Sequence, residues 1–184
     1  ADEIIGDIGF PPTVNSEPLQ KTKGARPLEG IRVLDMGWIL SVPHCGAWLG
    51  TLGAEVIEVE SMASLDLGRK VALGGGADGT PGINRNSNYN SLNFSKNGFT
   101  VNLKTKEGLD LFKELVAISD VVIENFATDV MNNLGCGYRE LAIHRPDIVM
   151  LSGSTLGVDG PQRLASGFGP NVSSYAGLSY ISGY

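Results

Sequence analysis

The sequence predicts an α/β protein built on a doubly wound parallel sheet. Short apolar runs recur along the chain, longer segments with helical spacing separate them, and glycine or proline marks many of the boundaries. Strands that alternate with helices form βαβ units, whose strands are parallel and whose crossovers are right-handed. We therefore expect one parallel sheet with helices on both faces.

The first βαβ unit occupies residues 28–60. Its expected elements are a strand from Ile31 to Asp35, a helix from about His44 to Leu52, and a strand that begins at Glu55. Pro43 near the start of this helix and Gly53 just past its end have the usual placements for these residue types. Ligands of such sheets bind at the carboxyl ends of the strands, so residues 36–43 form the expected binding loop.

The rest of the chain continues the alternation. The further expected elements are a strand with alternating Phe99, Val101 and Leu103, a helix capped by Thr105, a strand from Val121 to Ile123, short helices that begin near Thr128 and at Tyr138, a strand from Ile148 to Leu151, and a helix after Gly169. Threonine is a favoured N-cap. Phe112 and Val116 belong to the apolar face by which the helix after Thr105 would pack on a sheet.

Two segments lack these patterns. Residues 1–26 contain several prolines and no clear periodicity, which predicts an extended N-terminal arm. Residues 61–90 contain glycine-rich and asparagine-rich pieces and predict a mobile loop. Its glycines at 74–76 do not follow a strand, so they do not indicate a phosphate-binding loop. Residues 27–184 are then the folded domain, which we expect to be incomplete at its C-terminus because neither a polar cap nor a charged tail closes it.

Composition and charge argue against several classes of protein. The chain has 184 residues and a net charge of −6, and because it lacks a Lys/Arg stripe we expect no nucleic-acid partner. No apolar run is long enough for a membrane span and no signal-peptide pattern opens the sequence, so we expect no membrane association and a cytoplasmic location. Two scattered cysteines and two histidines give neither a disulfide framework nor metal-ligand spacing, so we expect no metal site.

Five segments carry a resemblance to a known family. In chain order they are LEGIRVLDMG, LGTLGAEVIEVE, SLNFSKNGFTVNLKTKEG, DVVIENFATDVMNNLG and RPDIVMLSGSTLG. Together they resemble the N-terminal half of the family III coenzyme A (CoA) transferases, a superfamily that includes formyl-CoA transferases and acyl-CoA racemases. The resemblance covers nearly all of residues 27–184. It implies a Rossmann-like CoA-binding domain and an interlocked dimer.

The resemblance also implies a covalent mechanism. In the family, an aspartate carboxylate attacks the acyl-CoA thioester, an anhydride forms, and CoA returns to give an aspartyl-CoA thioester from which the acceptor acid takes CoA. That aspartate lies a short distance beyond the segment that ends at Tyr184, so we expect no catalytic residue in this chain. CoA and acyl-CoA are then substrates, and no tightly bound cofactor is expected.

The aspartates within the chain have structural explanations. Asp35 ends a buried strand and is expected to tie down the loop that follows it. Asp66 is expected to pair with Arg69 or Lys70. The neighbouring His44 and Cys45 point in different directions on a helix, so they are not expected to form a thiol–imidazole pair.

Six residues are candidates for CoA binding. Trp38, Ile39 and Leu40 occupy the loop where the family holds pantetheine and the acyl group, with core packing as the alternative for Trp38. Asn125 and Phe126 match the family's ENF motif, which lines the same crevice. Basic residues that formyl-CoA transferases carry are missing here, and the sixth candidate, Lys96, is a cation that could compensate. The alternatives for that role are Arg69, Lys70 and Arg139.

Three functions fit the resemblance. The first is a CoA-transferase subunit that moves CoA from an acyl-CoA, such as succinyl-CoA, to a free carboxylic acid. The second is a non-catalytic partner subunit of a heteromeric CoA-transferase. The third is an acyl-CoA racemase or isomerase. We expect a homologous subunit as partner, identical or not, because the GW turn and the SLDLGRK segment resemble paired-subunit enzymes such as succinyl-CoA:benzylsuccinate CoA-transferase.

Overall fold

The sheet confirms the predicted fold class. The computed structural model describes residues 26–70 and 82–183, and within them five parallel strands lie in the order β3-β2-β1-β4-β5. These strands are β1 (Arg32–Asp35), β2 (Glu55–Glu60), β3 (Lys96–Thr100), β4 (Val121–Glu124) and β5 (Val149–Ser152). The predicted arm, apart from Arg26, and the glycines at 74–76 lie outside the described residues.

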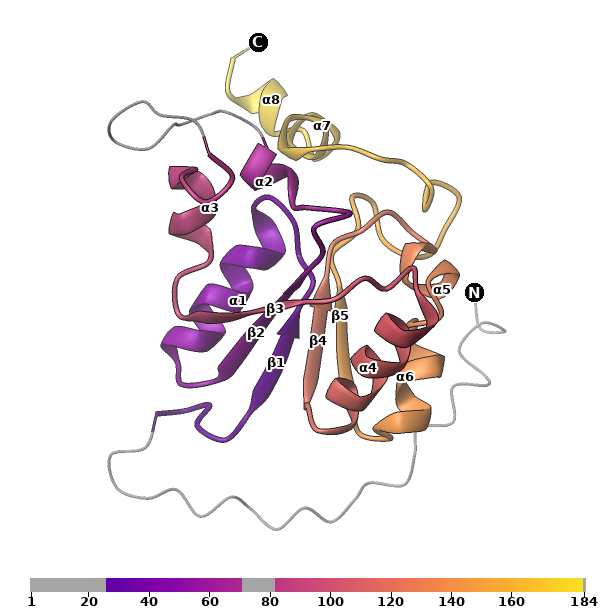
Figure 1. Ribbon diagram of the computed structural model, residues 1–184. Coiled ribbons are helices and arrows are strands. Elements are labelled where there is room, and N and C mark those ends of the chain that lie inside the picture. The colour runs from indigo at the N-terminus through magenta and orange to yellow at the C-terminus, as the bar shows by residue number, and fades with distance from the viewer. Residues whose placement is uncertain (1–25, 71–81, 184) are drawn as a thin grey trace.

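Helices cover both faces of the sheet, as predicted (Figure 1). α1 (Ser41–Thr51) and α3 (Ser87–Leu92) lie on one face, and α4 (Lys106–Ala117) and α6 (Tyr138–His144) lie on the other. α1 contacts four of the strands, β1 to β4, and α4 packs on α6. The other helices are α2 (Leu67–Lys70), α5 (Val130–Asn133), α7 (Gly169–Tyr175) and α8 (Leu178–Ile181).

The face under α4 and α6 buries an apolar cluster. Leu34 of β1 and Val122 of β4 pack there with Phe112 of α4 and Leu141 of α6, and all four side chains are fully buried. Burial of each such side chain stabilises the fold by about 1.5–3 kcal/mol. This cluster is the main core of the domain.

The face under α1 and α3 buries charge as well as apolar area. Side chains alternate along a strand, so Asp35 lies on the same face of β1 as Val33, and Glu58 on the same face of β2 as Val56. A smaller apolar cluster of Val33, Val42, Ala54, Val56 and Ile123 lies on this face. Asp35 and Glu58 are buried beside it, and so is the ammonium-bearing side chain of Lys96.

The boundaries of β3 differ from the prediction. The strand begins at Lys96 and ends at Thr100, whereas the alternation of apolar residues predicted a strand that continued to Leu103. Its partner β2 ends at Glu60, which pairs with Thr100, and the last ladder bond runs from the Val101 N–H to the Glu60 carbonyl at 2.8 Å. Without a neighbouring strand, the chain leaves the sheet at this point.

Two short helices, α2 and α3, lie in the segment that was predicted to be a loop. The Asn86 side chain caps α3 by accepting hydrogen bonds from the N–H groups of Asn88 and Tyr89. Tyr89 is the buried residue of α3. A helix with one inward side chain has no apolar periodicity, which explains why sequence patterns missed it.

Helix caps were predicted with mixed success. The hydroxyl of Thr105 accepts a hydrogen bond from the Gly108 N–H and caps α4 as expected. Thr128 does not begin α5, because Asp129 has a φ of 71° and the helix starts at Val130. The hydroxyl of Thr128 instead donates to the Arg163 carbonyl at 2.6 Å.

The single helix predicted after Gly169 is wrong. That segment forms α7 and α8, which are separated at Gly177, where φ is 78°. A left-handed residue cannot continue an α-helix, and glycine adopts this conformation without strain.

Candidate ligand-binding site

The order of the strands places a crevice between β1 and β4. The chain proceeds from β1 to β2 and β3 on one side, and from β4 to β5 on the other. The loops that leave neighbouring strands in opposite directions open a crevice at the carboxyl edge of the sheet, where ligands of such folds bind. The candidate residues at 38–40 and at 125–126 follow β1 and β4 and therefore meet at this crevice.

Trp38 and Asn125 join the two loops. The backbone N–H of Trp38 donates to Asn125 Oδ1 at 2.7 Å, and Asn125 Nδ2 donates to the Trp38 carbonyl at 2.9 Å. The rings of Trp38 and Phe126 meet edge to face, with centroids 5.5 Å apart and planes at 84°. Such a pair contributes about 0.5–1.5 kcal/mol beyond its buried area. The β1 loop is therefore fixed to the β4 loop by polar and aromatic contacts.

Two aspartates hold the β1 loop. Asp35 Oδ1 accepts a hydrogen bond from the Gly37 N–H at 2.8 Å, which confirms that Asp35 ties down the loop. Asp66 accepts from the Ile39 N–H at 3.0 Å to Oδ1 and 3.1 Å to Oδ2. Of its two predicted partners, Arg69 forms its ion pair with Glu60 of β2 instead, and the side chain of Lys70 lies outside the described residues.

A cavity of about 1210 Å³ opens beside these loops. The candidate residues Trp38, Ile39, Leu40, Asn125 and Phe126 all line it. Apolar side chains from β2, from the chain after β3, and from α5 and α7 complete much of the wall, namely Val59, Val101, Val130 and Val172. Pockets for small ligands usually measure about 300–1,000 Å³, so this cavity can accept a large one. An apolar wall with a few polar groups suits a ligand with a long uncharged portion.

Two charged residues line the cavity among those that the structure describes, Lys104 and Glu60. Lys104 is exposed and follows the carboxyl end of β3, so its ammonium can meet an anionic part of a ligand. Sequence reasoning missed Lys104, although its place just after a strand was a usable signal. Glu60 ends β2, and both of its carboxylate oxygens are bound by Arg69.

Lys96 lies apart from the other candidates. Its side chain is 1% exposed, and Nζ forms an ion pair of 2.6 Å with Asp35 Oδ2. The same nitrogen donates to Asn93 Oδ1 at 2.6 Å. Burial raises the pKa of Asp35, and the ammonium of Lys96 opposes that rise. Lys96 does not line the cavity, so any influence on a ligand there passes through Asp35 and its loop.

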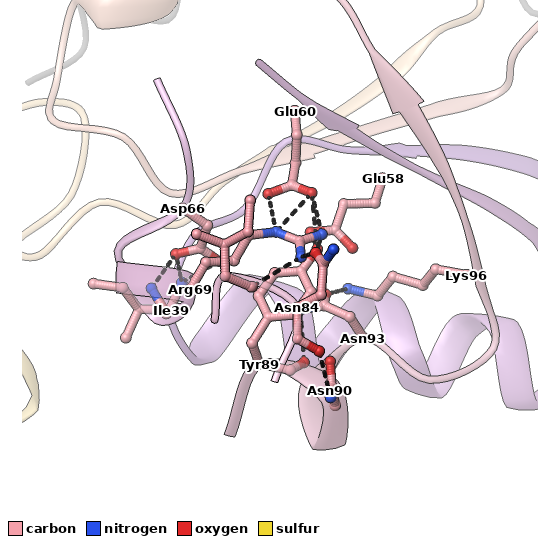
Figure 2. Close-up of polar contacts among 12 residues, drawn as sticks. Ile39, Glu58, Glu60, Asp66, Arg69, Asn84, Tyr89, Asn90, Asn93 and Lys96 are labelled. Carbon is pink, nitrogen blue, oxygen red and sulfur yellow. Dashed lines mark hydrogen bonds and ion pairs between the residues drawn. The ribbon is translucent and has the colours of Figure 1, made fainter. Parts of the chain in front are cut away.

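A cluster of buried and half-buried polar side chains connects β2 with α2 and α3 (Figure 2). The Tyr89 hydroxyl lies 2.6 Å from Glu58 Oε1 and 2.9 Å from Glu60 Oε2. The Arg69 guanidinium lies 3.6 Å over the Tyr89 ring and binds Glu60, Tyr89 and Asn84. Burial raises the pKa of Glu58 to about 7, and burial with the neighbouring carboxylates raises that of Tyr89. We call Glu58, Glu60, Arg69 and Tyr89 the Arg69 cluster.

The two histidines and two cysteines do not assemble a reactive centre. His44 Nε2 accepts from Trp48 Nε1 at 2.9 Å, one turn along α1, while the adjacent Cys45 lines the cavity. Across residues 26–70 and 82–183, no three His, Cys, Asp or Glu side chains are grouped to hold a metal ion. Over the same residues, no helix is both long and apolar enough to cross a membrane.

Comparison with known proteins identifies relatives of the chain. The sequence profile of CoA-transferase family III matches residues 28–184. The chain is 36% identical over 160 residues to the succinyl-CoA–L-malate CoA-transferase alpha subunit of Chloroflexus aurantiacus, covering 86% of this chain and 36% of that protein. It is 34% identical over 158 residues to the beta subunit of the same enzyme, covering 85% of this chain and 37% of that protein.

A solved structure shares the fold. The crystal structure of a CAIB/BAIF family protein from Brucella suis superposes with a TM-score of 0.74 at 30% identity, over 84% of this chain and 40% of that chain. The chain thus spans less than half the length of the relatives it matches.

Proposed function

The chain belongs to CoA-transferase family III, and we propose that the protein moves CoA from an acyl-CoA to a free carboxylic acid with CoA bound in the crevice between β1 and β4. The observation that carries this proposal is the cavity of about 1210 Å³ lined by Trp38, Ile39, Leu40, Asn125 and Phe126. It lies at the strand edge where ligands of doubly wound sheets bind. The names of the relatives, which are CoA-transferase subunits that use succinyl-CoA, support succinyl-CoA as the donor.

The cavity has chemistry that suits CoA. The pantetheine arm is long and weakly polar, and the apolar wall with the Trp38–Phe126 pair would enclose it. Phosphate groups need cations or free backbone N–H groups. Lys104 supplies a cation at the cavity wall, and the first turn of α1, which begins at Ser41, supplies N–H groups beside the β1 loop.

The carboxylate that would carry the acyl group and then CoA in the aspartyl-CoA mechanism is not one of the described cavity residues. Glu60 is the carboxylate that lines the cavity in the part of the chain that the structure describes, and Arg69 binds both of its oxygens. A nucleophile needs an oxygen free to attack the thioester. We therefore propose that an aspartate outside these 184 residues, in the same subunit or in its partner, forms the aspartyl-CoA intermediate.

A partner subunit is part of the proposal. The similarity to both subunits of one relative supports a paired enzyme. Large apolar side chains are also exposed on β5, α7 and α8 and on the segment between β5 and α7, namely Val149, Leu151, Leu164, Phe168, Tyr175, Tyr180 and Ile181. Where exposed apolar side chains gather into one patch, they mark an association site. A homologous subunit, identical or not, would bury it in an interlocked dimer.

The activity is tested on the full-length gene product, expressed alone and together with a homologous subunit. Each preparation receives succinyl-CoA and a panel of carboxylic acids, and the CoA esters are separated and quantified. Transfer by the protein alone supports a catalytic homodimer, and transfer only after co-expression supports a paired enzyme. Exchange of the α-hydrogen of a branched acyl-CoA with deuterated water, without CoA transfer, would replace the proposal by a racemase.

The site is tested by CoA titration of substituted proteins. We expect Trp38→Ala, Asn125→Ala and Lys104→Met each to weaken CoA binding by about 10-fold, the loss of one contact of about 1.4 kcal/mol. Trp48→Ala is the matched control, because Trp48 is exposed on α1 and does not line the cavity. Unchanged affinity in both Trp38→Ala and Asn125→Ala would place the CoA site elsewhere.

A further inference from the structure

Ile39 has a backbone conformation that its side chain disfavours. Its φ is 69°, in the left-handed region, which is about 10-fold less favourable for an L residue than the right-handed region. The penalty is greater for β-branched side chains such as that of isoleucine. Ile39 lies at the centre of the loop whose residues line the cavity. Such a conformation persists only where surrounding contacts enforce it.

The Asp66 carboxylate supplies the contact that enforces it. Both oxygens of this carboxylate lie within 3.1 Å of the Ile39 nitrogen, and Asp66 itself is 1% exposed. Oδ1 also accepts from the Gly68 N–H at 2.7 Å, so the same carboxylate caps the start of α2. Hydrogen bonds to a buried carboxylate are about twice as strong as neutral ones.

Arg69 fixes the position of Asp66. Its N–H donates to the Asp66 carbonyl at 3.0 Å, and its guanidinium binds Glu60 at the end of β2. Further donors of the same guanidinium reach Asn84 Oδ1 at 2.9 Å and the Tyr89 hydroxyl at 2.5 Å. α2 is thereby attached to the sheet, and Figure 2 shows Asp66 between Arg69 and Ile39.

We propose that Asp66 and Arg69 are positioning residues that hold the β1 loop in its binding conformation, rather than residues that contact the ligand. We call the hold of Asp66 and Arg69 on the β1 loop the clamp. The identity of the ligand rests on the proposed function, but the clamp does not. Under this assignment Arg69 is not a cation that binds phosphate, because its guanidinium is already bound to Glu60, Asn84 and Tyr89. Loss of the clamp lets Ile39 relax, and the binding conformation becomes a minor state.

The expected loss of ligand affinity follows from the population of the binding conformation. If Ile39 without Asp66 prefers the right-handed region about 10-fold, the apparent affinity for a ligand falls about 10-fold, because only the competent fraction binds. A glycine at position 39 adopts the left-handed conformation freely. In an Ile39→Gly background, Asp66→Ala should therefore weaken binding by only about 2-fold.

Hydrogen exchange of the ligand-free, full-length protein tests the clamp without reference to CoA. We expect Asp66→Ala to speed exchange of the peptide that contains residues 37–40 by about 10-fold, in line with the loop population. Asp120→Ala is the matched control, since the Asp120 carboxylate also accepts a backbone N–H, from Arg32 at 2.8 Å, at the opposite end of β1. It should leave this peptide unchanged. Asp66→Asn, which keeps one acceptor oxygen, provides the measurement if the alanine variant does not fold.

CoA titration of the same variants completes the test. The expected result is a weakening of about 10-fold for Asp66→Ala that shrinks in the Ile39→Gly background. Unchanged exchange at residues 37–40 in Asp66→Ala would overturn the proposal. So would an Arg69→Lys variant that binds CoA more weakly but keeps the parent exchange pattern, because Arg69 would then be a ligand contact. If the parent protein does not bind CoA, the proposed function fails while the exchange data still decide the clamp.

Discussion

A methyl group added at Gly46 should break the buried ion pair under α1. An ideal Cβ at this position would lie 2.1 Å from Asp35 Oδ2 and 3.1 Å from Lys96 Cε. The carboxylate cannot turn away freely, because Oδ2 binds Lys96 and Oδ1 binds the Gly37 N–H. Either α1 moves off the sheet or Asp35 and Lys96 separate.

Two opposing contributions set the change in the free energy of unfolding of Gly46→Ala. Alanine favours a helix interior over glycine by about 1 kcal/mol. Breaking a buried ion pair destabilises a protein by about 3–5 kcal/mol. Gly46→Ala should therefore lower the free energy of unfolding by about 2–4 kcal/mol, which is a fall of roughly 5–15 °C in the unfolding midpoint for a chain of this size.

Thermal and urea unfolding followed by circular dichroism measure the effect. The matched control is Gly98→Ala, because a Cβ at Gly98 of β3 meets no atom within 4 Å. We expect Gly98→Ala to unfold within about 0.5 kcal/mol of the parent protein, as surface substitutions generally do. A Gly46→Ala protein as stable as its parent, or more stable, would refute the close packing of α1 on Asp35.

Three further outcomes are expected. Burial raises the pKa of Glu58 from 4.5 to about 7, so between these pH values the native state keeps a proton that the unfolded state loses. The free energy of unfolding should therefore fall by up to about 3 kcal/mol as the pH rises through this window. Urea titrations at several pH values measure that fall, and Glu58→Gln should abolish it. Burial raises the pKa of the Cys136 thiol to about 12, so a thiol reagent at pH 8 should modify Cys45 and spare Cys136 until the chain unfolds. CoA should slow the modification of Cys45. Rapid reaction of both thiols in the folded protein would contradict this expectation. Phe112→Ala should lower the free energy of unfolding by about 3–5 kcal/mol and Leu111→Ala, at a 47% exposed position, by less than about 1 kcal/mol; equal losses would mean that α4 is rotated.

Residues that act through chain topology could be predicted from the sequence. Trp38 and Asn125 are 87 residues apart, yet each follows a strand of a parallel sheet, and this alone places both at one edge. The family resemblance pointed to the same loop. Topology does not specify individual hydrogen bonds, so the reciprocal pairing of these two residues appeared only in the structure.

Residues that act through a particular neighbour could not be predicted. Glu58 lies within a strand of mixed apolar and acidic residues, and nothing in that pattern indicated that its carboxylate would be buried against the Tyr89 hydroxyl of α3, 31 residues later. Lys96 was predicted to be a cation for the ligand, and the sequence did not indicate its ion pair with Asp35, 61 residues earlier. Asp66 was expected to pair with Arg69 or Lys70, and the structure adds a contact that the sequence did not indicate, the backbone N–H of Ile39 in the β1 loop. Patterns in the local sequence do not indicate partners that are far apart along the chain.

The unequal chemistry of the two sheet faces determines where this chain can accumulate sequence changes. Under α4 and α6 the side chains need only fill volume, so homologues can exchange leucine, methionine or valine there with small losses. Under α1 and α3 each charge depends on a specific partner, and a change at one position requires a compensating change at another. Divergence should therefore proceed by single substitutions on the first face and by paired substitutions on the second. Because the second face supports the β1 loop, new substrate preferences should arise through such pairs.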